Sequence, residues 1–210
     1  MLKVGLTGGI ATGKTVVSDI LRELGCYVLE ADKLAHEFYK PKTKVWKKIV
    51  DHFGKKILNP DSTINRVKLA NIVFNNNEER NFLNNLIHPL VIEKEKKIFK
   101  KIEKEGKYQI FITEAALIIE AGLASSFDRI IVVYCDEKTQ LKRLIERNNI
   151  ERENAIKRIK SQFPLKEKLK YADYIIDTSG TLRETVEQTE RVFRFLLQDY
   201  YLMKGGSENE

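Results

Sequence analysis

The residues best suited to chemistry lie near the start of the 210-residue chain, where glycine, lysine and threonine recur at a defined spacing. Gly8, Gly13, Lys14 and Thr15 match a pattern that cradles phosphate groups in many proteins. Glycines let a loop curl until several backbone N–H groups point at one place. Lys14 can then reach the β and γ phosphates, and the Thr15 hydroxyl can face Mg²⁺. The segment therefore predicts a nucleoside triphosphate site.

The elements that must hold this loop can be identified on either side of it. An apolar run at residues 2–7 precedes the loop, and apolar residues at helical spacing follow it over residues 15–25. A helix that begins near Lys14 would aim its free N–H groups and the positive end of its dipole at the loop. Strand, loop and helix in this order favour a phosphate site over an ordinary glycine-rich turn.

Four further apolar runs predict more strands. They are rich in β-branched residues and do not alternate with polar ones, as in strands buried on both faces of a parallel sheet. The runs cover residues 27–31, 109–115, 129–135 and, more weakly, 174–178. Helical patterns lie between them. We therefore predict an α/β fold with a five-stranded parallel sheet between two layers of helices, the three-layer fold of P-loop NTPases.

Two stretches are too long for simple crossovers and predict insertions. Residues 32–107 contain three helical patterns, and residues 149–172 are charged and helical. A small-molecule kinase must hold a second substrate near the γ-phosphate and must exclude water from the transfer step. One insertion for the acceptor and one for a lid would meet these needs, so the two insertions favour a kinase. We predict a single domain over residues 1–205 and a flexible tail over residues 204–210. Its core would comprise residues 1–31, 108–148 and 173–203.

The composition fits a globular protein with a charged surface. Hydrophobic residues make up 42% of the chain, charged residues make up 32%, and the formal net charge is +7. This positive balance fits either a solvated surface or the attraction of an anionic ligand, and charge alone does not separate the two. The basic stretches lack the interleaved aromatic residues that stack on nucleic acid. No apolar run approaches the roughly 20 residues that a membrane span needs.

The two cysteines, Cys26 and Cys135, both lie beside apolar runs. Isolated cysteines in such positions predict buried thiols and not a disulfide or a metal site. The N-terminus has no signal-peptide pattern, so the sequence favours the reducing cytoplasm. We expect a protein that acts on small molecules, without nucleic-acid or membrane partners. We also expect a monomer, with weak self-association left open.

A carboxylate follows the second apolar run. Asp32 falls just past residues 27–31, at the edge of a parallel sheet where α/β proteins place their sites. Asp32 could orient an attacking hydroxyl or accept its proton. It could equally cap the helix that follows, because aspartate is a favoured N-cap residue. No sequence that reads guanine follows the fourth or fifth run, which disfavours a GTPase switch.

A series of motifs, in order along the chain, resembles the dephospho-CoA kinase family. They are GLTGGIATGKT, VLEADKLAH, IHP, ALIIEAGL, QLKRLIERN, RENAIKRIKSQ and YIIDTSG. The resemblance covers about residues 2–200; its phosphate loop is generic, whereas ADKLAH, HP and QLKRLIER together are specific. It implies transfer of the γ-phosphate of ATP to the 3′-hydroxyl of the dephospho-CoA ribose, the last step of coenzyme A synthesis. It also implies a helical CoA-binding subdomain and a lid.

The resemblance implies roles for residues of the ATP site. Asp32 matches the proposed base for the 3′-hydroxyl, and Arg143 matches the arginine that meets the transferring phosphate. Arg147 lies one helical turn after Arg143 and would face the same way. Lys14 would act in catalysis, and Thr15 would face Mg²⁺. The ATP-binding residues would be Gly8, Gly9, Ile10, Ala11, Thr12, Gly13, Lys14, Thr15, Val16 and Arg147.

Further residues match the two insertions of the family. Arg66 and His88 match positions in the substrate-binding subdomain, together with Asp32. Gln162 and Arg152 match the lid. His88 has a plainer interpretation as a packed or turn histidine, because histidines of this kind are often structural. Arg143 and Arg147 could likewise belong to a solvated helix face, because exposed helical arginines are common.

The chain departs from the family pattern in a few places. Glu30 stands where the family usually has Asp, Ala116 where it often has Pro, and Ala11 where it often has Gly. We expect Ala11 to adopt a dihedral that alanine permits. Glu114, at the end of the third run, could act on the metal through water.

Two other interpretations stay open from the residues alone. A different small-molecule P-loop kinase would share the core and differ in the insertion that binds the acceptor. A nucleotide-dependent switch or binding protein would hydrolyse nucleotide slowly without an acceptor, and its binding to polyanions would weaken steeply with salt.

Overall fold

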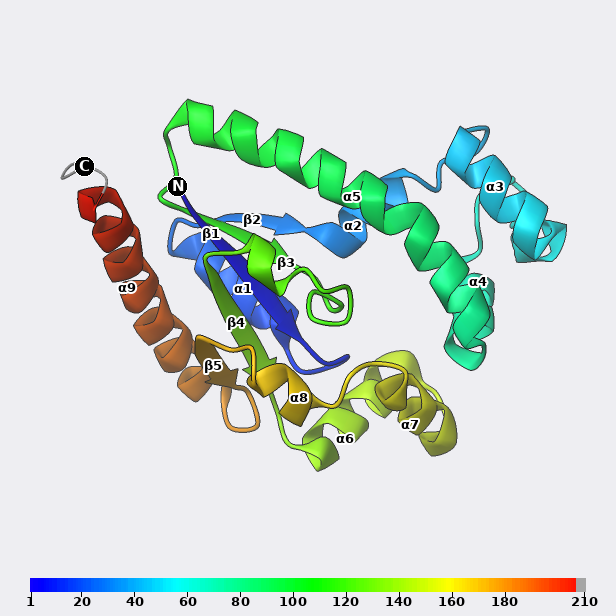
Figure 1. Ribbon diagram of the computed structural model, residues 1–210. Helices are drawn as coiled ribbons and strands as arrows, with labels where there is room; N and C mark the ends of the chain where they lie inside the picture. Colours follow the sequence, from blue (N-terminus) through cyan, green and yellow to red (C-terminus); the bar gives the residue numbers. More distant parts are fainter. Residues whose placement is uncertain (207–210) are drawn as a thin grey trace. The chain divides into compact units, whose positions relative to one another are not determined.

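The computed structural model describes residues 1–206, and part of this chain is built on one parallel sheet (Figure 1). The strands run in the order β2-β3-β1-β4-β5, and all four neighbouring pairs are parallel. They are β1 Leu2–Gly8, β2 Tyr27–Glu30, β3 Ile110–Glu114, β4 Arg129–Tyr134 and β5 Tyr174–Asp177. Each strand ends within one residue of the apolar run that predicted it. The predicted fold class is therefore confirmed.

Nine α-helices are described within residues 1–206. They are α1 Lys14–Glu23, α2 Ala31–Glu37, α3 Lys44–Phe53, α4 Arg66–Asn75, α5 Asn77–Glu105, α6 Glu137–Asn148, α7 Arg152–Lys160, α8 Leu165–Leu169 and α9 Leu182–Gly206. Asp136 caps α6, since its Oδ1 accepts a hydrogen bond of 2.9 Å from Thr139 N. Such a cap satisfies one of the free N–H groups that begin every helix.

The last helix continues beyond its expected end. α9 runs to Gly206, three residues into the segment 204–210 that the sequence predicts as a tail. Each residue added to an existing helix gains a backbone hydrogen bond, so a helix can extend past the apolar face that anchors it. The rest of the expected tail, residues 207–210, lies outside the described part of the chain.

The chain divides into two compact units. The sheet unit comprises Met1–Glu30 and Phe99–Glu210, and the helical unit comprises Ala31–Ile98. The sequence predicts an insertion that ends near residue 107, where the helical pattern stops. The final turns of α5 instead group with the sheet unit, because the Phe99 ring stacks edge-on against Phe111 of β3 with centroids 5.1 Å apart.

Two layers of apolar residues cover the sheet. On one face, α1 and α9 contribute Val17, Leu21, Val192 and Leu196, which pack against alternate residues of the strands. The opposite face is covered by the chain between β3 and β4 and by α8. Burial on both faces explains why the strands show no polar–apolar alternation.

An ionic contact fastens α9 to the sheet. The Arg129 guanidinium on β4 donates two hydrogen bonds of 2.9 Å to the Asp199 carboxylate on α9. The Tyr174 hydroxyl on β5 donates to the same carboxylate at 2.7 Å. A planar, two-point contact of this kind fixes orientation as well as distance. It therefore sets how α9 lies across β4 and β5.

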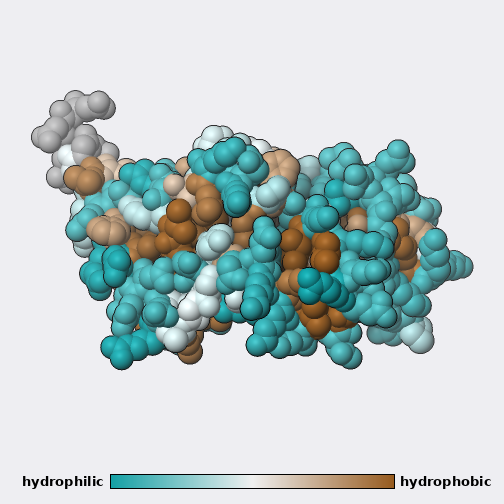
Figure 2. All heavy atoms as spheres, turned by 90° about the horizontal axis from the view of Figure 1, so that it is seen from below, coloured by the Kyte–Doolittle hydropathy of each residue, from teal (hydrophilic) through white to brown (hydrophobic). Residues whose placement is uncertain are grey.

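The helical unit has an apolar core of its own. Ile49, Phe53, Ile57, Leu69 and Ile87 form its centre, with contributions from α3, α4 and α5. The face of the molecule in Figure 2 is mostly hydrophilic, with apolar residues in smaller patches, as the high content of charged residues leads one to expect. Within residues 1–206, no helix combines the length and the apolar character needed to cross a membrane.

We expect Leu196→Ala to lower the free energy of unfolding by about 2–5 kcal/mol, because it leaves a cavity in the core. Leu202→Ala is the matched control on the same helix, since Leu202 is 75% exposed whereas Leu196 is fully buried. The control should change stability by less than about 0.5 kcal/mol. Urea denaturation followed by circular dichroism measures both. Equal losses in the two variants would contradict the packing of α9 described here.

Candidate functional site

The predicted phosphate loop joins β1 to α1 with a tight curl. Gly13, which precedes α1, has φ 89°, in the left-handed region that favours glycine. At Gly8 a side chain is excluded by space, because a Cβ there would lie 2.4 Å from the carbonyl oxygen of Val133. Gly13 is therefore required by its backbone conformation, and Gly8 is required because the loop passes close to β4.

Ala11 occupies the middle of the loop with φ 59°. That value falls in the small left-handed region that L-residues tolerate at some cost. Ala11 thus adopts a dihedral that alanine can reach, as expected, but one that costs free energy. The Ala11 methyl group packs with Leu144 of α6 and Ala155 of α7, so burial of the methyl group offsets part of the cost.

Lys14 lies over the loop that it follows. Its Nζ donates hydrogen bonds to Gly9 O at 2.9 Å and to Gly8 O at 3.3 Å. The Lys14 ammonium therefore lies against the loop, and α1 begins at the same residue, so its charge and the positive end of the helix dipole both favour an anion there. Thr15 is exposed on the first turn of α1.

A buried chain of hydrogen bonds supports the loop from behind. Arg143 on α6 donates to Thr178 Oγ1 at 2.9 Å and to Thr178 O at 2.7 Å. The Thr178 hydroxyl, just past β5, donates to Thr12 O at 2.7 Å. Thr12 Oγ1 in turn donates to Gly9 O at 2.9 Å. α6 and the segment just past β5 thus hold the curl in place. Thr178 lies in the YIIDTSG motif, but sequence reasoning gave it no role.

Two glutamine side chains bind the same residue of the loop. Gln140 of α6 donates to Ile10 O at 2.9 Å, and Gln162, between α7 and α8, accepts from Ile10 N at 2.8 Å. Gln162 matches the lid of the resembled family, and the structure gives this residue a direct contact with the loop. Arg152, at the start of α7, is exposed.

The two arginines of α6 differ in their surroundings. Arg143 is half-buried and bound to Thr178, and it also lowers the pKa of Cys135, although burial dominates and raises the pKa of that thiol to about 11. Arg147 is exposed and donates to Asn148 Oδ1 at 3.0 Å. The structure therefore connects Arg143 to the loop, through Thr178, and shows no such connection for Arg147 among the described hydrogen bonds.

Carboxylates lie at the same end of the sheet as the loop. Glu30 and Glu114 are register partners at the ends of β2 and β3, and Glu114 is also opposite Leu6 of β1. Within residues 1–206, no group of three or more His, Cys, Asp or Glu side chains could hold a metal ion.

The helical unit contains a second polar group around Asp32. Asp32 lies in the first turn of α2, where its negative charge complements the helix dipole. Burial and the nearby Arg66 lower the pKa of His36, whereas Asp32 raises it. Burial also lowers the pKa of His88, and Asp32 again acts in the opposite direction. Asp32 is therefore close enough to act electrostatically on both His36 and His88, and Arg66 on His36.

Sequence reasoning missed His36 and Tyr39 as members of this group. Burial raises the pKa of Tyr39 to about 12, with a smaller contribution from Asp32, and its ring centroid lies 5.7 Å from that of His36. His36 stands four residues after Asp32 and so shares a face of α2 with it. That spacing is the signal that could have identified His36.

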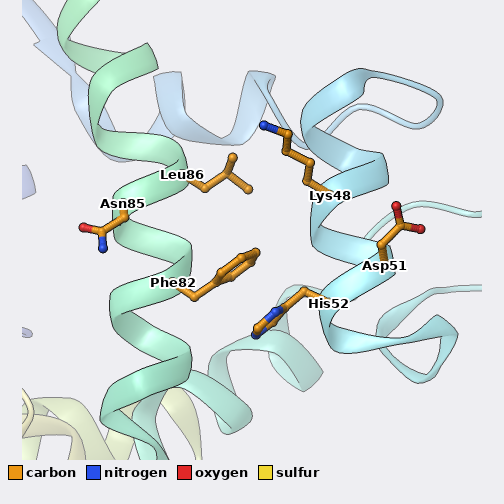
Figure 3. Close-up of a pocket in the computed structure, with 6 residues that line it drawn as sticks. All are labelled: Lys48, Asp51, His52, Phe82, Asn85 and Leu86. Carbon is orange, nitrogen blue, oxygen red and sulfur yellow. The ribbon is translucent and has the colours of Figure 1, made fainter.

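The helical unit also has a cavity of about 650 Å³ between α3 and α5. Figure 3 shows Lys48 and His52 of α3 and Phe82 and Leu86 of α5 directed toward one another. The His52 and Phe82 rings stack with centroids 3.6 Å apart. The six lining residues include none of the predicted substrate residues, so this cavity and the group around Asp32 are separate features.

Known proteins resemble this chain over most of its length. The family model described as dephospho-CoA kinase matches residues 2–184. A dephospho-CoA kinase of Carboxydothermus hydrogenoformans is 44% identical over 185 residues, which are 88% of this chain and 89% of that protein. TT1252 from Thermus thermophilus has a similar structure, with a TM-score of 0.74, 25% identity and coverage of 91% and 95% of the two chains. For the dephospho-CoA kinase from Campylobacter jejuni the TM-score is 0.59 and the identity 31%, over 92% and 96% of the chains.

We expect Thr178→Val to weaken ATP binding by about fivefold, the factor that roughly 1 kcal/mol of loop distortion produces. The substitution keeps the shape but removes the hydroxyl that joins Arg143 to Thr12. Thr189→Val is the control, because Thr189 is also buried and its hydroxyl, among the described hydrogen bonds, donates to Thr185 O of its own helix and to nothing in the loop. Isothermal titration with a non-hydrolysable ATP analogue measures both. Identical affinities would remove Thr178 from the support of the loop.

We expect the helical unit to lose stability as the pH falls through the histidine range. The pKa values of His36 and His88 are lowered in the folded state. As the pH falls through about 6.5, the unfolded chain therefore binds more protons than the folded chain, and the folded state loses stability. His88→Gln should therefore make the free energy of unfolding less dependent on pH in this window. Urea denaturation at neutral and at mildly acidic pH measures the slope. A slope unchanged by the substitution would contradict the burial of His88.

Proposed function

We propose a mechanism for this chain that follows from its family. The chain belongs to the dephospho-CoA kinase family, whose reaction is the last step of coenzyme A synthesis. It is a kinase that transfers phosphate to a hydroxyl group. The finer proposal is that the γ-phosphate of ATP passes to the 3′-hydroxyl of the dephospho-CoA ribose. The observation that carries it is the curled loop with Lys14 above it, braced by buried hydrogen bonds.

ATP would bind with its phosphates on the loop and at the start of α1. The backbone from Gly8 to Val16 would supply N–H donors, and the Lys14 ammonium would leave the carbonyl oxygens of Gly8 and Gly9 to meet the β and γ phosphates. Transfer of a phosphoryl group depends mainly on position and on neutralised charge. A loop that is already curled avoids reorganisation during the reaction.

The proposed metal is Mg²⁺, with the Thr15 hydroxyl as its protein ligand. When bound, Mg²⁺ neutralises charge on the phosphates. Glu114 would act through water, since it lies at the end of β3, beside β1. This small set of protein groups fits a cation that keeps several of its waters.

Asp32 is the proposed partner of the acceptor hydroxyl. Its carboxylate is exposed on the first turn of α2, so it is free to accept a hydrogen bond from a substrate. Arg66 is exposed in the same unit and would hold a negatively charged part of dephospho-CoA, and His88 would add a polar contact. His36 and Tyr39 join them because they share the electrostatic surroundings of Asp32.

The contacts of Arg143 refine the role proposed for it. Two of its N–H groups bind Thr178, so Arg143 would help to hold the loop. We propose that it also acts near the phosphates. Arg147 is exposed on the same helix and would supply the second positive charge. Together they would balance charge on the migrating phosphoryl group.

The proposed setting is the cytoplasm, and the proposed form is a monomer. Cys26 and Cys135 are both free and buried, as in proteins of reducing compartments. Burial raises the pKa of Cys26 to about 12, so its thiol stays protonated and unreactive at neutral pH.

We expect Asp32→Asn to lower kcat at least about a hundredfold, because the amide cannot accept the hydroxyl proton. The KM for ATP should stay within about twofold, since Asp32 is not part of the phosphate loop. Asp51→Asn is the control, because Asp51 is an exposed aspartate of the same helical unit. Steady-state kinetics with ATP and dephospho-CoA measure both. Full turnover in Asp32→Asn would remove this residue from the mechanism.

A further inference from the structure

One lysine of the predicted lid is fully buried, unlike its neighbours. Lys168 on α8 has a side chain with 0% exposure, whereas Lys170, just past the end of α8, is 66% exposed. Lysines are almost never fully buried unless they are paired. Lys168 Nζ lies 2.8 Å from Glu120 Oε1 and donates to Ala116 O at 2.6 Å. Its ammonium is therefore directed at the loop that follows β3.

Glu120 binds this part of the chain at two points. Besides pairing with Lys168, its Oε1 accepts a hydrogen bond of 3.0 Å from Phe163 N, between α7 and α8. Its other oxygen is buried without a hydrogen-bond partner within the described residues. The negative charge of Glu120 thus has few other contacts to stabilise it, which makes the pair with Lys168 matter more.

The same turn of the chain also reaches the phosphate loop. Gln162, immediately before Phe163, accepts the hydrogen bond from Ile10 N. Two adjacent residues therefore bind two different loops: Phe163 contacts the loop after β3, and Gln162 contacts the phosphate loop. If α8 left Glu120, Phe163 would lose its acceptor, and Gln162 would no longer be held at 2.8 Å from Ile10.

We propose that Lys168 and Glu120 are positioning residues, whose ion pair holds the segment of residues 149–172 against the loop that follows β3 and keeps Gln162 on the phosphate loop. This inference rests on the proposed transfer reaction. The pair would hold the segment over the nucleotide and so limit the access of water. Lys168 itself is no phosphate ligand, because its ammonium is enclosed and directed at Glu120 and Ala116.

Burial and pairing act against each other on Lys168. Burial lowers the pKa of Lys168, whereas the hydrogen bond and charge of Glu120 raise it. A substitution that removes one partner leaves the other buried without compensation, whereas removal of both does not. The two residues should therefore behave as one unit in a double-mutant cycle.

The test compares Lys168→Met, Glu120→Gln and the double variant in the full chain, with Lys170→Met as the matched control. Lys170 is an exposed lysine of the same segment whose partner is Glu167. We expect each single variant to raise the KM for ATP about tenfold and to raise ATP hydrolysis relative to transfer. The double variant should be no worse than either single variant, because it leaves no charge buried without a partner. Hydrogen exchange should be faster in residues 149–172 and unchanged in the strands.

A role in stability alone would lower the melting temperature and leave the KM for ATP and the ratio of hydrolysis to transfer unchanged. That result, or effects of the two substitutions that multiply, would overturn the proposal. If Lys168→Met does not fold, Glu120→Gln decides, since it keeps the acceptor for Phe163 N and removes only the charge. Failure of the wild-type protein to phosphorylate dephospho-CoA would instead refute the proposed function, and hydrogen exchange would still test the ion pair.

Discussion

The structure depends on holding a short loop in a curl that brings several backbone N–H groups together. Such a loop has few side chains with which to stabilise itself, and one of its residues, Ala11, has a dihedral that alanine adopts only at some cost. The support comes from outside the loop. Thr178 binds Thr12 O, and Gln140 and Gln162 bind the two backbone groups of Ile10. Catalysis of phosphoryl transfer relies on donors that are already in position, so this support is part of the chemistry.

The sheet supplies the frame for these contacts. Parallel strands bring the ends of β1, β3, β4 and β5 to one edge, so the phosphate loop, Glu114, α6 and Thr178 meet there although they are far apart in sequence. The helical unit has a separate core and carries its own polar group around Asp32. In the proposed reaction the sheet unit would supply the phosphate donors, and the helical unit would supply groups suited to an acceptor hydroxyl.

The local features of the fold could be predicted from the sequence. Strand positions followed from continuous β-branched runs, and the phosphate loop followed from residue types at short spacing. Features that depend on long-range contact could not. Lys168 stands in the run LKEKL, where a lysine resembles any solvated one, and only the fold brings Glu120 to it. The bonds from Arg143 to Thr178 are of the same kind, since the two residues belong to different elements.

The most direct test of the account is the mass of the product formed from ATP, Mg²⁺ and dephospho-CoA by the purified protein. We expect a product heavier than dephospho-CoA by one phosphate group, formed only when both substrates are present, with the new phosphate on the 3′-oxygen by phosphorus and proton NMR. Slow loss of ATP that is indifferent to dephospho-CoA would contradict the account. The phosphate loop would then stand as a nucleotide site, and the helical unit would require a different acceptor.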